Sequence, residues 1–163
     1  MLSEYDELCY RANQELDLLI GQRGTAVAWE VGEVAYCYSS SYGHGSQILY
    51  GDLGFHPPAA LLADGLLDKG YLEATIGELP DYPAEHIFIT SKPSTPLGRQ
   101  YFSHLLHSRR WQELQAVRNG RVFQLDESEM FYGFDPLSSM AQLKALMQAI
   151  KSQIYMGSDH IRP

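Results

Sequence analysis

The fold is indicated most directly by one stretch of the chain, Trp111-Gln-Glu-Leu-Gln-Ala-Val-Arg-Asn-Gly-Arg-Val-Phe-Gln-Leu125. Its middle contains Asn119-Gly120, a dipeptide that marks turns. The segment after that turn, 121–125, has a strand-like composition centred on Val122 and Phe123. We therefore predict a turn at Asn119-Gly120 that leads directly into a strand over 121–125.

Three further strands are predicted nearer the N-terminus. His86-Ile-Phe-Ile-Thr90 is a compact apolar run bounded by turn signals, which is typical of a buried, parallel strand. Two other β-rich runs, 25–31 and 34–38, are separated only by Gly32-Glu33. A short Gly-containing turn between two such runs predicts a hairpin.

Helices are predicted around these strands from the spacing of apolar residues. Ser3 to Asp6 supplies a start signal for the first helix, and Gly21 supplies a stop signal. Asp135-Pro136 is a favourable entry to the last helix, because proline is best tolerated at the first helical position. The predicted helices cover 3–20, a short segment through Leu49, 59–67, 97–109 and 135–154. Strands that alternate with helices predict a layered α/β domain.

The composition limits the classes of function. The chain has 163 residues, a formal charge of -8 and 45% hydrophobic residues, which is typical of one globular domain. The excess of acid argues against direct binding of nucleic acid, which depends on Lys and Arg at phosphates. Cys9 and Cys37 are far apart and form no CxxC pair.

The N-terminal twenty residues are too acidic to be a signal peptide, and no apolar run approaches the roughly 20 residues that span a bilayer. We therefore expect no membrane insertion and no export signal in this stretch. The chain is then either a cytosolic protein or a piece of something longer.

The quoted stretch resembles the "W-x-x-L-x-A-V-x-x-G-R-V-[YF]" pattern near the end of periplasmic substrate-binding proteins for iron-siderophore and cobalamin-type ligands. Three other segments are similar to the same family and occur in the same order, namely 49–58, 77–90 and 131–150. The resemblance therefore extends over most of the chain, from about Val27 to Ile150.

The resemblance implies a specific architecture. Members of the family have two α/β lobes joined by one long helix, and they hold the ligand in the cleft between the lobes. This chain would be the C-terminal lobe, a three-layer α/β/α unit with a mostly parallel central sheet plus an N-terminal hairpin. Residues 1–22 would be the end of the connecting helix, and residues 23–163 would form the single lobe. A missing N-terminal lobe would complete the cleft.

The implied function is a ligand-binding module, not an enzyme, that recognises a ferric siderophore or a similar metal chelate. The hairpin Trp29 to Tyr38 and the turn Gly54-Phe-His-Pro-Pro58 look closer to cytoplasmic, siderophore-responsive regulators of the AraC type. The main hypothesis is therefore a sensor attached to a DNA-binding domain. The alternative is an exported, extracytoplasmic binding protein of an ABC transporter. A protein-interaction domain is the alternative from another class.

The transport members also carry a glutamate on the short helix before the apolar strand, which pairs with an arginine of the membrane permease. Glu78 is the candidate for that docking residue here. It also stands three residues after Thr75, which is the spacing of a helix capping box.

Candidate ligand contacts lie in three loops, 39–46, 91–99 and 126–134, because ligands of open α/β sheets sit beyond strand ends. A bulky and often anionic chelate calls for cationic and aromatic side chains. The loops offer Tyr42, His44, Lys92, Arg99, Phe131 and Tyr132.

We expect no catalytic residues, no metal site and no cofactor. Cys37 lies within a strand pattern and is expected to be a packing residue. His104 and His107 have i, i+3 spacing, but no carboxylate or cysteine nearby in sequence completes a ligand set. The chain contains no G-x-S-x-G, G-x-G-x-x-G or P-loop motif.

Overall fold

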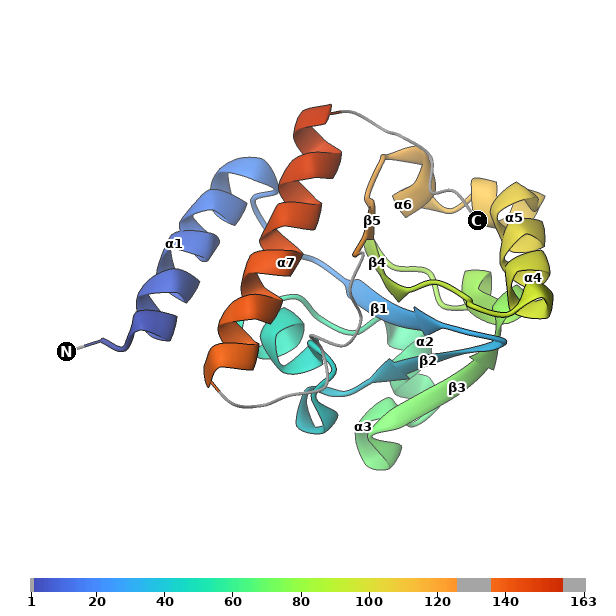
Figure 1. Ribbon diagram of the computed structural model, residues 1–163, viewed down its shortest axis with the longest axis horizontal. Coiled ribbons are helices and arrows are strands. Elements are labelled where there is room, and N and C mark those ends of the chain that lie inside the picture. The colour runs from blue at the N-terminus through green and yellow to red at the C-terminus, as the bar shows by residue number, and fades with distance from the viewer. Residues whose placement is uncertain (1, 126–135, 157–163) are drawn as a thin grey trace.

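The computed structural model describes residues 2–125 and 136–156 of the chain (Figure 1). The described strands are β1 (Ala26–Val31), β2 (Val34–Tyr38), β3 (Tyr71–Thr75), β4 (His86–Ser91) and β5 (Val122–Gln124). The α-helices are α1 (Glu4–Leu19), α2 (Ala59–Ala63), α3 (Leu66–Lys69), α4 (Pro96–His107), α5 (Arg109–Gln112), α6 (Gln115–Arg118) and α7 (Pro136–Met156). The remaining helical turns are η1 (Ser40–Tyr42), η2 (Gln47–Asp52), which is a π-helix, and η3 (Ile76–Asp81).

Within the described ranges the strands form one mixed five-stranded sheet in the order β3-β2-β1-β4-β5. β2 is antiparallel to both β1 and β3, whereas β4 is parallel to both β1 and β5. The register places Ile87 of β4 beside Val27 of β1 and Val122 of β5, so these side chains share one face of the sheet. The predicted hairpin is confirmed, and Gly32 N–H donates to the carbonyl of Val34 where it turns.

One face of the sheet carries the larger of the two hydrophobic core clusters. Trp29 of β1 and Cys37 of β2 are buried there against Phe102 of α4 and Trp111 of α5. The i, i+4 spacing along α4 turns Phe102 and Leu106 toward the sheet, whereas Leu97 and Tyr101, which the sequence also offered as apolar positions of this helix, are exposed.

The other face is covered by α1, η2 and α7, and α1 and α7 lie side by side (Figure 1). Leu16 of α1 and Leu146 of α7 are buried over Ala28, Phe88 and Phe123 of the sheet. Small alanines on β1 leave room for the two phenylalanines of β4 and β5, whose ring centroids are 4.9 Å apart. Helices therefore cover both faces, and the predicted three-layer α/β/α class is confirmed.

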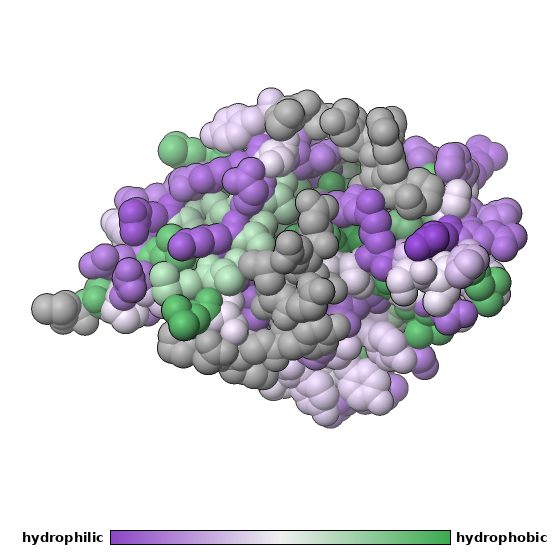
Figure 2. Space-filling model, in the orientation of Figure 1, coloured by the Kyte–Doolittle hydropathy of each residue, from purple (hydrophilic) through white to green (hydrophobic). Residues whose placement is uncertain are grey.

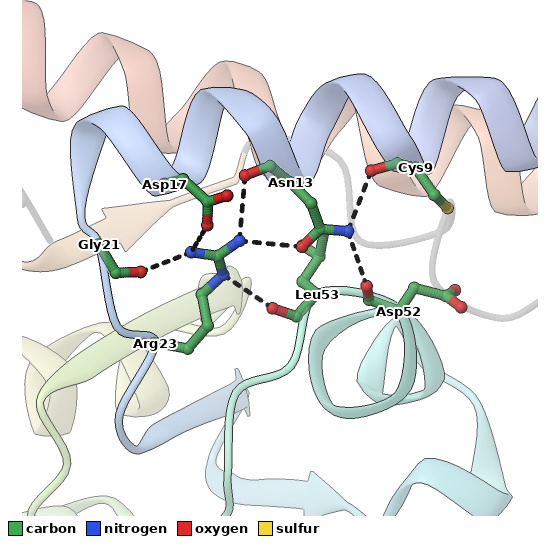
Figure 3. A network of polar contacts seen from close by, with 7 residues as sticks. All are labelled: Cys9, Asn13, Asp17, Gly21, Arg23, Asp52 and Leu53. Carbon is green, nitrogen blue, oxygen red and sulfur yellow. Dashed lines mark hydrogen bonds and ion pairs between the residues drawn. The ribbon is translucent and has the colours of Figure 1, made fainter.

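Arg23 joins the end of α1 to the rest of the fold (Figure 3). Its guanidinium donates to the carbonyl oxygens of Gly21, Leu53 and Asn13, to the side-chain oxygen of Asn13, and pairs with Asp17 at 3.0 Å. The Arg23 side chain is only 11% exposed, so these carbonyls are satisfied away from bulk solvent.

The two ends of α1 are also defined by local contacts. Ser3 forms a capping box with Asp6, and Gly21 follows the last turn with a φ of 78°. Near the start of the helix the Tyr5 hydroxyl donates to Asp52 at 2.5 Å. Both predicted end signals of this helix are thus confirmed. The assignment of 1–22 as the end of an inter-lobe helix, and of 23–163 as one lobe, stays a prediction.

The outward surface of α1 and α7 is mixed in character. Figure 2 shows hydrophilic and hydrophobic residues interspersed over these two helices. The exposed apolar side chains there include Leu18, Leu137 and Tyr155. Within the part of the chain that the structure describes, no helix combines the length and the apolarity needed to cross a bilayer.

The structure differs from the sequence expectations in one strand. β3 was not predicted, because only Leu72 and Ala74 of its five residues are buried and the others are exposed. This strand lies at the edge of the sheet, where one face and one backbone edge meet solvent and the apolar signal is weak. It adds a second antiparallel pairing to that of the hairpin, so the sheet has two antiparallel and two parallel pairings, where the expectation was a mostly parallel sheet plus a hairpin.

Candidate functional site

The loop 39–46 is held at both ends and open in its middle. Ser39 and Ser46 are buried, and Ser39 N–H donates to the carbonyl of Gly70 at 2.8 Å. Because β2 is antiparallel to β1, the loop leaves the sheet at the end opposite the β1–β2 turn and folds back over the face that η2 covers. It therefore presents its central side chains on one face of the sheet.

The Tyr42 ring lies against the backbone of Gly70. A Cβ built on Gly70 would lie 2.1 Å from the Tyr42 ring, so only glycine fits beneath it. The other neighbour is Tyr71, whose ring centroid is 6.0 Å from that of Tyr42. Tyr42 keeps 48% of its surface exposed. One side of the Tyr42 ring therefore packs on Gly70, and about half of the residue's surface remains exposed.

His44 is held in a backbone conformation that L-residues rarely adopt. Its φ is 56°, and the glycines on either side have φ values of 81° and 85°. The imidazole stacks on Tyr38 with centroids 3.7 Å apart and planes 7° from parallel. Its Nδ1 lies 2.6 Å from a carboxylate oxygen of Glu30. Strain of this kind is typical of functional sites, and here the contacts with Tyr38 and Glu30 help to maintain it.

Together these rings form one surface, which we call the aromatic patch: Tyr38, Tyr42, His44 and Tyr71. Tyr38 and Tyr71 are cross-strand partners of β2 and β3, so their side chains stand on the same face. Neighbouring planar rings that keep exposed area suit a bulky ligand with flat, partly apolar surfaces. The structure thus brings two of the predicted residues, Tyr42 and His44, into one patch.

The predicted cationic residues lie elsewhere. Arg99 is exposed on α4, the helix that covers the opposite face of the sheet from the aromatic patch. Lys92 is exposed directly after β4, beside the β1–β2 turn. Neither forms an ion pair within 2–125 and 136–156. Phe131 and Tyr132 lie outside the described residues, so their predicted roles stay predictions.

An open depression of about 330 Å³ lies at the β1–β2 turn, where two inner strands of the sheet end. It is lined by Glu30, Val31, Gly32, Glu33, Val34, Tyr36 and Ser91. The Tyr36 hydroxyl at its margin donates to Glu73 at 2.9 Å, and this hydrogen bond raises the pKa of Tyr36. The depression is therefore acidic in character and contains none of the predicted site residues.

Glu78 is exposed on η3, next to the end of β3. The Thr75 hydroxyl donates to its carboxylate at 2.9 Å, and Thr75 makes no side-chain bond to the backbone of the helix. The capping-box interpretation of this pair was therefore wrong, because the two side chains bond to each other. The Glu78 carboxylate keeps acceptor capacity on the surface.

The described residues offer no evident catalytic group. Cys37 is 1% exposed, and burial raises its pKa to about 12, so the thiol is protonated at neutral pH. No group of three or more His, Cys, Asp or Glu side chains within the described ranges could hold a metal ion. Cys37 is a packing residue, as predicted.

Sequence reasoning missed Glu30, Tyr38 and Gly70, which hold the aromatic patch in place. The signal for Gly70 was present, since glycine before a strand often marks a position with positive φ, here 85°. The sequence signal for Glu30 was weaker: it is the single charged residue in the otherwise apolar run Ala26–Val31, and a charge in a buried strand needs a partner. Its partner His44 is fourteen positions away and is brought close by the fold.

Comparison with known proteins relates the fold of this chain to that of proteins of known structure. No family model matches the chain. In fold, the chain is similar to the FhuD protein from S. pseudintermedius, with a TM-score of 0.75, 22% identity, and coverage of 90% of this chain and 51% of that one. It is also similar to FhuD2 of Staphylococcus aureus with bound ferrioxamine B, with a TM-score of 0.71, 19% identity, and coverage of 93% and 56%. The chain therefore has the fold of FhuD-type siderophore-binding proteins.

A particular relative is identified by sequence. The chain is homologous to the iron(3+)-hydroxamate-binding protein FhuD of Bacillus subtilis (strain 168), with 26% identity over 151 residues. A FhuD-fold periplasmic binding protein of a Fep/Fec-like ferrichrome ABC transporter from Bacillus subtilis is 25% identical, with a TM-score of 0.70 and coverage of 90% of this chain and 54% of that one.

The coverage is unequal in the two directions. The match to the hydroxamate-binding protein includes 91% of this chain and 46% of that protein. The chain thus spans about half the length of the relatives it matches, which fits the predicted single lobe of a two-lobed protein.

Proposed function

We propose that this chain is the C-terminal lobe of a ferric-siderophore-binding protein that serves an ABC transporter. The observation that carries the proposal is the aromatic patch, a preformed surface of four rings, in a chain homologous to a hydroxamate-siderophore receptor. The lobe would supply half of a cleft and bind the intact chelate through outer contacts. Closure of a second lobe over the ligand would then favour the bound state.

A transporter is favoured over a cytoplasmic regulator as the parent. The features that resembled AraC-type regulators are core residues here, since Trp29 and Phe55 are each 1% exposed. These residues pack in the core, so they do not distinguish a regulator from a transporter binding protein. The Bacillus subtilis relative is described as part of a ferrichrome ABC transporter, which supports the transporter reading and an extracytoplasmic location.

Docking to a permease belongs to the same proposal. Glu78 is exposed and tethered by Thr75, so its carboxylate is presented in a defined place at the end of β3. A carboxylate held in this way can form a charge-assisted pair with an arginine of a membrane partner.

The proposal is tested by titrating the 163-residue chain with ferrioxamine B, ferrichrome and their iron-free forms while following intrinsic fluorescence. We expect saturable quenching by the ferric forms, and weaker binding after Tyr42→Ala. Tyr101→Ala is the matched control, because Tyr101 is 46% exposed on α4, close to the 48% of Tyr42, but lies over the opposite face of the sheet. No saturable quenching by either ferric chelate, or equal losses in both variants, would contradict the proposal.

A further inference from the structure

Glu30 is an unusual residue for its place in the sheet. It lies near the end of β1, whose other five residues are buried, and its own side chain is 15% exposed. Side chains alternate along a strand, so Glu30 points to the same face as Ala26 and Ala28, the face of the aromatic patch. A carboxylate this poorly solvated is costly unless it is paired. Its partner is His44, 2.6 Å away, with the Tyr38 hydroxyl at 3.4 Å.

This pairing determines how the imidazole is presented. A carboxylate accepts hydrogen bonds, so the proton of the contact resides on Nδ1 of His44 and the ring directs Nε2 away from Glu30. Stacking on Tyr38 restricts the tilt of the ring, and the positive φ of 56° restricts its backbone. Glu30 therefore supplies an in-plane contact that restrains the rotation of the His44 ring, whose tilt the stacking on Tyr38 already restricts.

The same residue adds a negative charge beside the patch. Glu30 brings a carboxylate to this face of the sheet, and Glu73 adds a second one opposite Tyr36 of β2. The cationic candidate Arg99 lies on the helix over the opposite face. A ligand with net negative charge would meet repulsion here that a neutral or cationic chelate would not.

We propose that Glu30 is the positioning and charge-selecting residue of the site: it orients His44 toward the chelate and discriminates against anionic chelates. This inference rests on the proposed function and deepens it, because it names the charge class of the substrate. Glu30 need not touch the chelate to do so, since a carboxylate in a partly desolvated place acts over several ångströms.

Charge selection is tested with three ferric chelates: ferrioxamine B, which is cationic, ferrichrome, which is neutral, and an iron(III) tris-catecholate, which is anionic. Glu30→Gln keeps the shape and an acceptor for Nδ1 while it removes the charge. We expect the preference for the cationic over the anionic chelate to fall by roughly tenfold or more. Glu33→Gln is the matched control, because Glu33 is exposed three residues further on and carries the same charge. An equal shift in both variants, or none in Glu30→Gln, would overturn charge selection.

Positioning is tested without a ligand, by nitrogen-15 NMR of the histidine rings. The wild-type chain and Glu30→Gln are expected to show His44 with its proton on Nδ1, whereas Glu30→Ala is expected to lose that preference. An unchanged His44 signal in Glu30→Ala overturns the positioning role. If the wild-type chain binds none of the three chelates, the proposed function and the charge selection both fail. The ring measurement then still decides whether Glu30 positions His44.

Discussion

The ring of Tyr42 covers Gly70 so closely that a Cβ on Gly70 would lie 2.1 Å from it. Gly70→Ala should therefore displace Tyr42 from its seat, and it should also strain a backbone position with a φ of 85°. We expect a loss of about 1–2 kcal/mol in the free energy of unfolding by urea. We also expect weaker quenching by ferrioxamine B, because the aromatic patch would lose its geometry.

Gly77→Ala is the control for this prediction. Gly77 has no atom within 4 Å of an added Cβ, and its φ lies outside the positive range. It should leave both the unfolding free energy and the ferrioxamine B affinity close to wild type. Equal effects of the two substitutions would show that the contact with Tyr42 is not what matters.

A second prediction follows from the distance between the cationic candidate Arg99 and the aromatic patch, which lie over opposite faces of the sheet. Arg99→Gln should leave the affinity of this chain for ferrichrome within about twofold of wild type, since α4 covers the other face of the sheet. The measurement is the fluorescence titration used for Tyr42→Ala. A loss of tenfold or more would place the ligand near α4 and away from the patch.

Arg23 is expected to be the most sensitive charged residue for stability. Arg23→Ala would leave the carbonyls of Gly21, Leu53 and Asn13 without their donor in a poorly solvated place. The expected loss is about 2–4 kcal/mol in urea unfolding. Hydrogen exchange should also accelerate in α1, because this helix is held to η2 through the same network (Figure 3).

The matched control is Arg109→Ala. Arg109 pairs with Glu113 at 2.8 Å, but its side chain is 89% exposed, and such surface pairs contribute little. Arg23→Lys separates charge from shape, since an ammonium group cannot donate to several carbonyls in one plane as a guanidinium does. Full stability in Arg23→Lys would show that charge alone is required.

His86 makes the stability of the fold depend on pH. It is 4% exposed and lies between Phe55 and Phe123, and burial is the main cause that lowers its pKa from 6.5. The unfolded chain therefore binds a proton more readily than the folded one. Above pH 6.5 His86 is neutral in both states and does not lower the free energy of unfolding. Below that pH the unfolded chain takes up the proton first, so the free energy of unfolding declines as the pH falls.

His86→Gln should accordingly flatten the decline in unfolding free energy between about pH 7 and pH 5. The measurement is urea unfolding at a series of pH values, with His104→Gln as the control because His104 is exposed on α4. The same slope in wild type and His86→Gln would assign the acid sensitivity to other groups.

Glu78 provides a prediction about the proposed docking. Glu78→Arg in the parent protein should lower siderophore uptake by cells and leave ferrichrome affinity unchanged, since Glu78 lies at the end of β3 and outside the aromatic patch. Glu113→Arg, on another exposed surface, should leave uptake normal. A parallel loss of affinity and uptake would contradict a role confined to docking.

The local elements of this protein could be predicted from its sequence. The apolar run 86–90 and the stretch 121–125 became the adjacent parallel strands β4 and β5. The period-3.6 pattern likewise predicted α4 and α7, and the turn signals predicted the hairpin around Gly32. These features depend on residues a few positions apart, where burial pattern and turn chemistry act directly.

Other features were decided only by the tertiary structure. β3 has too little apolar signal to be recognised alone, and it exists because its backbone pairs with β2. The contacts of Tyr42 with Gly70 and of His44 with Glu30 join segments that the chain path separates by 28 and 14 positions. Periodicity carries no information about such pairs. They are set by strand order and by the direction in which a loop folds back over the sheet, so Tyr42 and His44 come together in one patch only in the assembled fold.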